Sequence, residues 1–236
     1  MDPTIRRLLS AVPDQPKWVE LRAMLLSGQC EVYGLEGAER LSFVARHAEM
    51  EMVSIYGRPA PDVIRRVIAL PPSPETVLCL PEDRRHVAES LTEWRSEIAT
   101  IYRLATGERL PEVTADAVRL LSPSEIEAMN HAPAELKEEL IEAVTLTPIA
   151  ATCIGKLPVA FCYAGSRTEN LWDISIDTLA EYRSQGHAAL CVAFMIEYFR
   201  RQGLAPVWGA LESNIPSMRL AAKLGFTPVD QIVVFE

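Results

Sequence analysis

The sequence has no long hydrophobic run. No segment reaches the roughly 20 consecutive apolar residues that a membrane-spanning helix needs. The first residues, "MDPTIRRLLSAVPDQPKW", hold a short apolar stretch that is broken by Pro13, which does not fit the hydrophobic core of a signal peptide. These absences argue against a helical membrane protein and predict a soluble cytoplasmic protein with no membrane partner.

Paired cysteines and metal-ligand patterns are also missing. The 5 cysteines are scattered and contain no CxxC pair, so neither a zinc knuckle nor a disulfide framework is indicated. The 4 histidines show no spacing that is typical of metal ligands. We therefore expect no metal site. Cys162 and Cys191 lie in apolar runs and are expected to be buried.

Positive charge is scarce. The chain carries 23 Lys and Arg against 32 Asp and Glu, a net charge of −9. Such a balance argues against nucleic acid as a partner, because charge-driven binding to phosphates requires clustered Lys and Arg. A local basic spot would still suffice for one small anion. The 49% hydrophobic content over 236 residues is enough for one large core or two small ones.

The first part of the chain alternates between helical and strand patterns. Helices are predicted at 17–28, 60–70 and 82–94, and strands at 30–37, 76–81 and 97–105. The stretch 106–116 is polar, lacks periodicity and contains Gly107 and Pro111, which is typical of a linker. We therefore divide the chain into an N-terminal α/β domain of unknown role (1–105), a linker (106–116) and a C-terminal domain (117–236).

The C-terminal domain predicts a mixed α/β fold. Ser122, Pro123 and Glu125 form the signature of a capping box at a helix start. Strands are predicted at 117–121, 148–154, 157–165, 171–178, 206–212 and 231–236. Helices are predicted at 133–144, 186–202 and 213–226, and a further helix is predicted to start at Ser122. Ser213 and Asn214 both remain candidates for the cap of the last helix. Three hairpin-linked strands followed by a β-α-β unit favour a mixed sheet flanked by helices.

The turn between the strand at 171–178 and the helix that follows it is unusually bare. It reads "EYRSQGHAAL" and carries one cation, Arg183, followed by Gly186 and Ala188. A helix N-terminus offers unpaired N–H groups and a partial positive charge, which together bind anions. Gly186 allows close approach to the backbone, and Arg183 adds a charge-assisted partner. The turn therefore predicts a site for the diphosphate of a nucleotide-type cofactor.

Two separated motifs in this domain resemble those of the GNAT acyltransferase superfamily. The Arg-x-x-Gly-x-Ala pattern from Arg183 to Ala188 resembles the motif Q/R-x-x-G-x-G/A, and "NIPSMRLAAKLGF" from Asn214 to Phe226 resembles a second motif, in which an Asn opens a helix that ends in Lys-Leu-Gly-Phe. The resemblance covers about 117–236. Trp208, Asn214, Ser217 and "AAKLGF" are similar to a branch that includes zwittermicin-resistance acetyltransferases.

The resemblance implies a GNAT-type mixed sheet that binds acetyl-CoA, or another acyl-CoA, in a V-shaped opening between the strands at 171–178 and 206–212. The diphosphate would lie on the turn, the pantetheine arm along the first of the two strands, and Asn214 near the arm. The implied cofactor-binding residues are Ile176, Thr178, Arg183, Ser184, Gln185, Gly186, His187, Ala188, Asn214 and Ser217.

Acetylation of an amine needs a base that takes the amine's proton. Strand alternation places Leu171, Asp173, Ser175 and Asp177 on one face of the strand at 171–178. This polar face is either the floor of a substrate site or simply a solvated face. In the first case Asp173 is the first choice for the base, since it lies deeper in the strand, and Asp177 and Glu212 are the second choices.

One position departs from the family pattern. Many members carry Tyr at the place of Ala221, where the phenol protonates the departing thiolate. We expect an N-acetyltransferase that acts directly on a small-molecule amine. The alternatives are a non-catalytic acyl-CoA-binding module, which Ala221 favours, and an acetyltransferase for protein N-termini or lysines. The order of elements from 60 to 105 faintly echoes half of a GNAT fold without any phosphate turn. The sequence leaves the acceptor, the acyl length and the oligomeric state open.

Overall fold

A computed structural model of the chain describes residues 2–36, 41–114 and 116–236. It contains two compact units. The first comprises Met1–Tyr102, Gly209–Met218 and Pro228–Glu236, and the second comprises Arg103–Trp208 and Arg219–Thr227. The units therefore interleave along the sequence, which the predicted division into 1–105 and 117–236 does not express. Within the described ranges, no helix is long and apolar enough to cross a membrane.

The first unit is a mixed sheet with helices packed on it. Its helices are α1 (Pro3–Ala11), α2 (Val19–Ser27), α3 (Pro61–Ile68) and α4 (Arg84–Ala88). Its strands are β1 (Cys30–Glu36), β2 (Ser42–His47), β3 (Met52–Tyr56), β4 (Thr76–Cys79), β5 (Ser96–Leu104) and the last strand of the chain, β11 (Phe226–Phe235). Their order is β1-β2-β3-β4-β11-β5. The helix predicted at 82–94 is shorter than expected, because it begins as a 3-10 turn and α4 ends at Ala88.

Strands β2 and β3 were not predicted from the sequence. All six residues of β2 are buried, so the strand lacks the alternation that marks a half-exposed strand. Phe43 packs in the cluster that contains Leu21 of α2, whereas Val44 packs in the cluster that contains Ile64 of α3. Helices thus cover both faces of β2.

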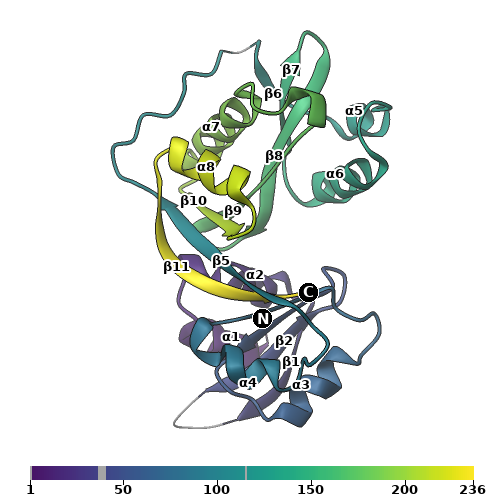
Figure 1. The fold of residues 1–236 in the computed structure, drawn as a ribbon, viewed down its shortest axis with the longest axis vertical. Coiled ribbons are helices and arrows are strands. Elements are labelled where there is room, and N and C mark those ends of the chain that lie inside the picture. The colour runs from purple at the N-terminus through teal and green to yellow at the C-terminus, as the bar shows by residue number, and fades with distance from the viewer. Residues whose placement is uncertain (1, 37–40, 115) are drawn as a thin grey trace. The chain divides into compact units, whose positions relative to one another are not determined.

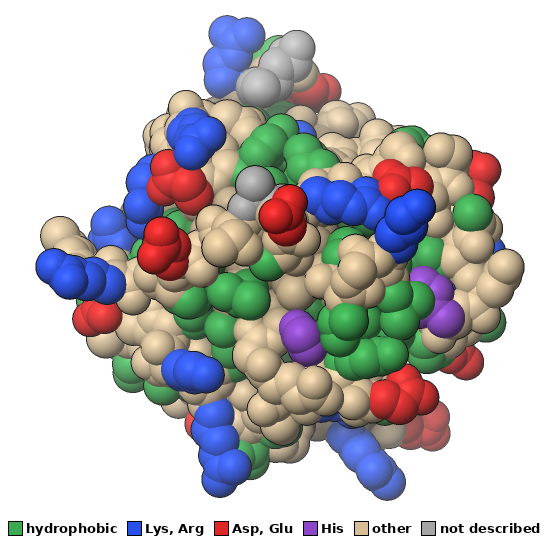
Figure 2. Space-filling view, turned by 90° about the horizontal axis from the view of Figure 1, so that it is seen from above, with side chains coloured by type: hydrophobic (Ala, Val, Ile, Leu, Met, Phe, Trp, Pro, Cys, Tyr) green, Lys and Arg blue, Asp and Glu red, His purple; other side chains and the backbone are tan. Residues whose placement is uncertain are grey.

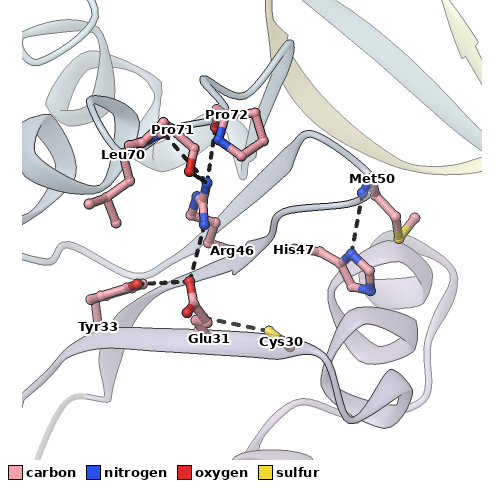
Figure 3. Close-up of polar contacts among 9 residues, drawn as sticks. All are labelled: Cys30, Glu31, Tyr33, Arg46, His47, Met50, Leu70, Pro71 and Pro72. Atoms are coloured by element: carbon pink, nitrogen blue, oxygen red, sulfur yellow. Dashed lines mark hydrogen bonds and ion pairs between the residues drawn. The ribbon is translucent and has the colours of Figure 1, made fainter.

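The same strand buries a charged side chain, Arg46, which is only 5% exposed. Its guanidinium donates to Glu31 at 3.1 Å and to the carbonyl oxygens of Pro71 and Pro72 at 2.9 Å each (Figure 3). A buried cation is tolerated only when such partners replace water. Arg46 therefore ties β1, β2 and the loop after α3 together.

The second unit contains the elements that sequence analysis placed in the C-terminal domain. Its helices are α5 (Pro123–Glu127), α6 (Ala134–Leu146) and α7 (His187–Arg200), and its strands are β6 (Val118–Leu120), β7 (Ala150–Ile154), β8 (Leu157–Arg167), β9 (Leu171–Thr178) and β10 (Ala205–Leu211). The strands lie in the order β10-β9-β8-β7-β6. The predicted capping box at Ser122 is confirmed, since its hydroxyl accepts from Glu125 N–H while the Glu125 carboxylate accepts from Ser122 N–H.

Helices cover both faces of this sheet (Figure 1). Trp172 of β9 packs on Phe199 of α7, with ring centroids 4.6 Å apart. Phe161 of β8 instead belongs to the cluster that contains Ile126 of α5 and Leu140 of α6. Cys162 and Cys191 are fully buried, as predicted. The face of β9 opposite Trp172 therefore points to the side of α5 and α6.

The chain's last strand stabilises the first unit. β11 pairs with β4 through Val233–Cys79, Val234–Leu78 and Phe235–Val77. Phe235 is 1% exposed and packs in the same cluster as Val44 and Ile55. A strand from the end of the sequence thus supplies core side chains to a sheet that is otherwise built from the first hundred residues.

Replacing Phe235 by Ala is therefore expected to destabilise the first unit. Truncation of a buried Phe removes apolar burial and leaves a cavity, at a cost of about 3–5 kcal/mol. Chemical denaturation should show this loss in the free energy of unfolding. The matched control is Val229→Ala on the same strand, where the side chain is 46% exposed and the expected change is within about 0.5 kcal/mol. Equal losses in the two variants would contradict the assignment of Phe235 to the core.

Candidate functional site

The parallel strands β9 and β10 are paired only at one end. The described pairs join Leu171–Asp173 to Ala205–Val207. β9 continues beyond the last pair to Thr178, and β8 accompanies it on its other side as far as the pair Ala160–Thr178. Beyond Asp173, one edge of β9 has thus left its ladder with β10. Backbone N–H and C=O groups on such an edge are available to an extended ligand.

The turn after β9 leads into an uncapped helix N-terminus. Ser184 and Gly186 have left-handed backbone, with φ of 61° and 92°. Gly186 is the N-cap of α7, and among the described residues no side chain caps this end. The helical ladder starts with Leu190 N–H donating to Gly186 O at 3.3 Å, so the N–H groups of His187, Ala188 and Ala189 precede it.

Space in front of this terminus is open. A Cβ atom added to Gly186 would meet no heavy atom within 4 Å. This end of the helix suits a diphosphate for three reasons. Three N–H groups precede the helical ladder, the helix dipole has its positive end here, and the space beside Gly186 is open. The geometry of the turn therefore fits the cofactor that the sequence predicts for it.

Arg183 lies at the edge of this turn with an exposed side chain. Its Nε donates to the carbonyl oxygen of Thr178 at 3.1 Å, which holds the guanidinium near the end of β9. The Gln185 side chain instead bonds back to Glu181 O at 2.9 Å. Arg183 is thus placed beside the helix N-terminus with its charge in reach of an anion.

His187 takes part in the site through its backbone. Its carbonyl oxygen accepts from Thr152 Oγ1 at 2.9 Å, which fixes the start of α7 to β7. Its ring packs edge-on against Tyr182 at 6.3 Å between centroids. Within the part of the chain that the structure describes, buried Nε2 has no hydrogen-bond partner. The ring contact thus lies with Tyr182 of the turn, and a role of His187 toward a cofactor stays a prediction.

The polar face of β9 carries Asp173, Ser175 and Asp177. The register pairs Tyr163 with Ser175 and Phe161 with Asp177, so these side chains share the face that points to α5 and α6. Tyr163 Oη donates to the carboxylate of Glu139 on α6. The Tyr163 phenol thus hydrogen-bonds the Glu139 carboxylate and the Ser175 hydroxyl, beside the part of β9 that extends past its ladder with β10.

Gly165 on β8 makes room on this face. A Cβ there would come within 2.9 Å of Ser175 Oγ and 3.8 Å of Asp173 Oδ2. Asp173 and Ser175 thus lie over a position without a side chain. The structure brings two of the three predicted bases, Asp173 and Asp177, into one unit with the turn at 183–188.

Electrostatics distinguish Asp177. Its pKa is raised above the usual 3.8, mainly by burial and further by the negative charge of Glu139, while the Arg183 guanidinium opposes the shift. Burial and the Glu139 carboxylate also raise the pKa of Tyr163, so the phenol keeps its proton at neutral pH. A carboxylate with a raised pKa beside a polar site is typical of acid–base chemistry.

Sequence reasoning missed Glu139 and Tyr163. Glu139 lies in the run "KEEL" of an amphipathic helix, where an acidic side chain is read as solvent-facing. Tyr163 lies in a hydrophobic strand and is read as core. Only the pairing of β8 with β9 and the packing of α6 reveal that both belong to the polar cluster.

Three predicted site residues belong to the first unit. Glu212 is exposed and lies 3.5 Å from the Gln231 side-chain amide. Asn214 Oδ1 accepts from Ser217 N–H at 3.1 Å, so Asn214 rather than Ser213 caps α8 (Ile215–Lys223). Ser213 bonds instead to Glu97. Their roles toward a cofactor or an acceptor stay predictions.

Ala221 on α8 is fully buried. The position where many family members carry a proton-donating Tyr is therefore closed to solvent. Trp208 is 1% exposed and packs against Phe226 with ring centroids 5.4 Å apart, which makes it a core residue.

Charges and possible metal ligands add no further site. Figure 2 shows Lys and Arg side chains interspersed with Asp and Glu on the face it displays. Among the described residues, no group of three or more His, Cys, Asp or Glu could hold a metal ion. The turn at 183–188 and the polar face of β9 thus remain the candidate site.

Comparisons with known proteins agree with this arrangement. Residues 151–235 match the model of the family described as GNAT acetyltransferase. A GCN5-related N-acetyltransferase-like protein from Streptococcus suis has a similar structure (17% identity, TM-score 0.70, 98% of this chain and 97% of that chain). So has a GCN5-related N-acetyltransferase from Kribbella flavida (15% identity, TM-score 0.62, 100% and 95%). A tandem GNAT protein from the clavulanic acid biosynthesis pathway is also similar (12% identity, TM-score 0.53, 93% of both chains). No curated protein matches the sequence.

Proposed function

We propose that the chain is an N-acyltransferase that moves an acetyl group from acetyl-CoA to the amine of a small molecule. The match of residues 151–235 to the GNAT acetyltransferase family supports this proposal. The observation that carries the proposal is the open, left-handed N-cap of α7 directly after β9, whose ladder with β10 ends at Asp173. Acetyl-CoA supplies the activated thioester. The chain supplies the binding groups, the alignment and a base.

Binding uses the backbone first. A diphosphate would accept from the N–H groups of His187, Ala188 and Ala189, which precede the helical ladder, and Arg183 would add a charge-assisted contact. The edge of β9 at Ile176 and Thr178 would accept and donate hydrogen bonds along the pantetheine arm. Asn214 and Ser217 complete the predicted set.

The base follows from the electrostatics. An amine must lose a proton before its lone pair attacks the thioester carbon, and a carboxylate in reach accepts that proton. We propose Asp177 for this role ahead of Asp173, since its pKa is raised by burial and by Glu139. As the C–N bond forms and the C–S bond breaks, the proton of the amine moves to this carboxylate, and coenzyme A leaves as a thiolate that takes a proton from solvent. The backbone N–H groups on the free edge of β9 would stabilise the developing charge on the carbonyl oxygen.

One observation favours a second candidate function, acyl-CoA binding without turnover. Ala221 is buried where the family often places a proton-donating Tyr. An assay that measures both the release of free thiol and the mass of the amine separates the two functions. Full-length protein, acetyl-CoA and a panel of primary amines should give thiol and acetylated amine together. Thermal stabilisation by acetyl-CoA without thiol release from any amine would favour the binding module, and no stabilisation would refute both functions.

Replacing Arg183 by Ala should weaken CoA binding while leaving the fold intact. A lost charge-assisted contact to phosphate costs about 1.5–3 kcal/mol, or about a 10- to 100-fold rise in the dissociation constant. The exposed side chain should change the free energy of unfolding by at most about 1 kcal/mol. Calorimetric titration and thermal denaturation of the same preparation test both expectations. Severe unfolding would mean that Arg183 is a structural partner of Thr178.

The acidic limb of the pH–rate profile should depend on Glu139. A raised pKa keeps Asp177 protonated, and inactive as a base, to higher pH than an ordinary aspartate. Glu139→Gln keeps a hydrogen-bond acceptor for Tyr163 but removes the negative charge, so the pKa of Asp177 should fall and the limb should move to lower pH. The control is Glu138→Gln, on the exposed neighbouring residue, which should leave the limb in place. A limb that moves to higher pH in Glu139→Gln would contradict the role of Asp177.

A further inference from the structure

The chain repeats one order of elements. Apart from 3-10 turns, the first half runs α1-α2-β1-β2-β3-α3-β4-α4-β5, and the part after β6 runs α5-α6-β7-β8-β9-α7-β10-α8-β11. The pairings repeat too. β1–β2, β2–β3, β7–β8 and β8–β9 are antiparallel, whereas β3–β4 and β9–β10 are parallel. The turn between β3 and α3 therefore corresponds to the cofactor turn between β9 and α7.

The corresponding turn lacks what binds an anion. It spans only 57–60, against 179–186 in the second unit. Helix α3 starts with Pro61, which has no N–H group, and Val63 N–H is already bonded to Ala60 O at 3.0 Å. Asp62 places a carboxylate in the first helical turn, where it would repel a phosphate.

The strands on either side also leave no opening. Described pairs join Met52–Ser54 to Thr76–Leu78. β3 ends at Tyr56 and β4 at Cys79, close to the last pair, whereas β9 extends from Asp173 to Thr178 beyond its own. An extended arm would find almost no free strand edge here.

Side chains also tie this turn to the rest of the first unit. The segment that follows β4 holds the turn through three bonds: Arg58 Nε to Asp83 Oδ1 at 2.7 Å, Arg58 Nη2 to Glu82 O at 3.0 Å, and His86 Nε2 to Pro59 O at 2.7 Å. The Asp83 side chain is 9% exposed, so its charge depends on Arg58. Arg58 is thus the counterpart of Arg183, but its charge is paired with Asp83 of the same chain rather than offered to a ligand.

We infer that the first unit is a second copy of the acyltransferase fold that has lost its cofactor opening, so that each chain binds one acyl-CoA, at the second unit. The short turn at 57–60, which leads directly into Pro61, offers no anion site, and the Arg58–Asp83 bridge stabilises it in this closed form. The count of one rests on the proposed function. The closure rests on the geometry of the turn and strands of the first unit and is independent of that function. Arg58 therefore contributes to the stability of the fold, whereas Arg183 contributes to ligand binding.

A paired comparison of Arg58→Ala and Arg183→Ala tests this division. Native mass spectrometry and calorimetric titration of the full chain with coenzyme A should give one molecule bound per wild-type chain. Arg58→Ala should keep the dissociation constant within about twofold and lower the melting temperature by about 5 °C, because it leaves the Asp83 charge unpaired. Arg183→Ala should raise the dissociation constant and leave the melting temperature nearly unchanged. Arg58→Lys should recover part of the lost melting temperature.

Two molecules of coenzyme A per chain would overturn the inference, and so would binding that Arg58→Ala abolishes in a folded protein. If Arg58→Ala does not fold, Asp83→Asn, which removes the charge but keeps the shape, should fold with a lowered melting temperature and still bind one coenzyme A. A wild type that binds no coenzyme A would refute the proposed function. The closed state of the turn at 57–60 would then be tested by melting temperatures alone. An unchanged melting temperature in Arg58→Ala would overturn it.

Discussion

Turnover should fall by about 10²–10⁴-fold when Asp177 is replaced by Asn, the range typical of the loss of a general base. The substitution keeps the size of the side chain and one hydrogen-bonding oxygen, so the dissociation constant of CoA should stay within about twofold. We expect this because Asp177 is buried, lies near the negative charge of Glu139 and shares a face of β9 with Ser175. Steady-state kinetics with a saturating amine measure the effect.

Two matched variants separate the candidates for the base. Asp173→Asn removes the other carboxylate of the same face, and Glu212→Gln removes an exposed carboxylate of the first unit. We expect both to retain most of the turnover number. A loss of turnover in Asp173→Asn, together with normal turnover in Asp177→Asn, would show that Asp173 is the base. Full activity in all three variants would show that water or the free amine itself manages the proton.

Replacing Gly186 by Trp should abolish cofactor binding. The residue has φ of 92° and open space where its Cβ would point, so a large side chain would occupy the place of the diphosphate. Loss of two charge-assisted hydrogen bonds costs about 3 kcal/mol or more, which corresponds to at least about a 100-fold weaker dissociation constant. Calorimetric titration with CoA measures it.

Gly186→Ala is the control for backbone strain. It imposes the same left-handed backbone on a residue with a Cβ, at about 1–2 kcal/mol, but adds only a methyl group to the open space. We expect a lowered melting temperature with CoA affinity reduced far less than in Gly186→Trp. Unchanged affinity in a folded Gly186→Trp would place the diphosphate elsewhere.

The second unit was largely predictable from the sequence because its signals are local. Ser122 and Glu125 fix a helix start, "LWDISIDT" alternates as a strand does, and Gly186 marks the turn before a helix. Each signal depends on a few neighbouring residues whose backbone preferences agree with the fold. The GNAT resemblance rested on two such stretches, and residues 151–235 match that family. The zwittermicin-resistance-like branch stays a prediction.

The rest depends on contacts between distant residues. β2 is buried on both faces and shows no alternation, so its pattern did not stand out. The Glu139–Tyr163 bond joins a helix to a strand. The choice of Asp177 over Asp173 follows from the burial of Asp177 and from the negative charge of Glu139. The pairing of Val233 with Cys79 joins segments separated by more than half of the chain. Local periodicity carries no information about such partners.

The pairing of β11 with β4 of the first unit also determines what removal of the first hundred residues would do. A chain that begins near Thr114 keeps β11 but lacks β4, its described partner through Val233–Cys79. It would expose the apolar side chains of Val233 and Phe235, which are buried in the full chain. The first unit therefore has to be tested by substitutions in the full chain, as in the comparison of Arg58 with Arg183.

A crystal structure of the full chain with acetyl-CoA tests the central claim most directly. We predict one cofactor molecule, with diphosphate oxygens within hydrogen-bond distance of the N–H groups of His187 and Ala188, Arg183 beside them, and the pantetheine arm along β9 past Ile176. Cofactor bound at the turn 57–60, or at any place away from the N-terminus of α7, would contradict the account.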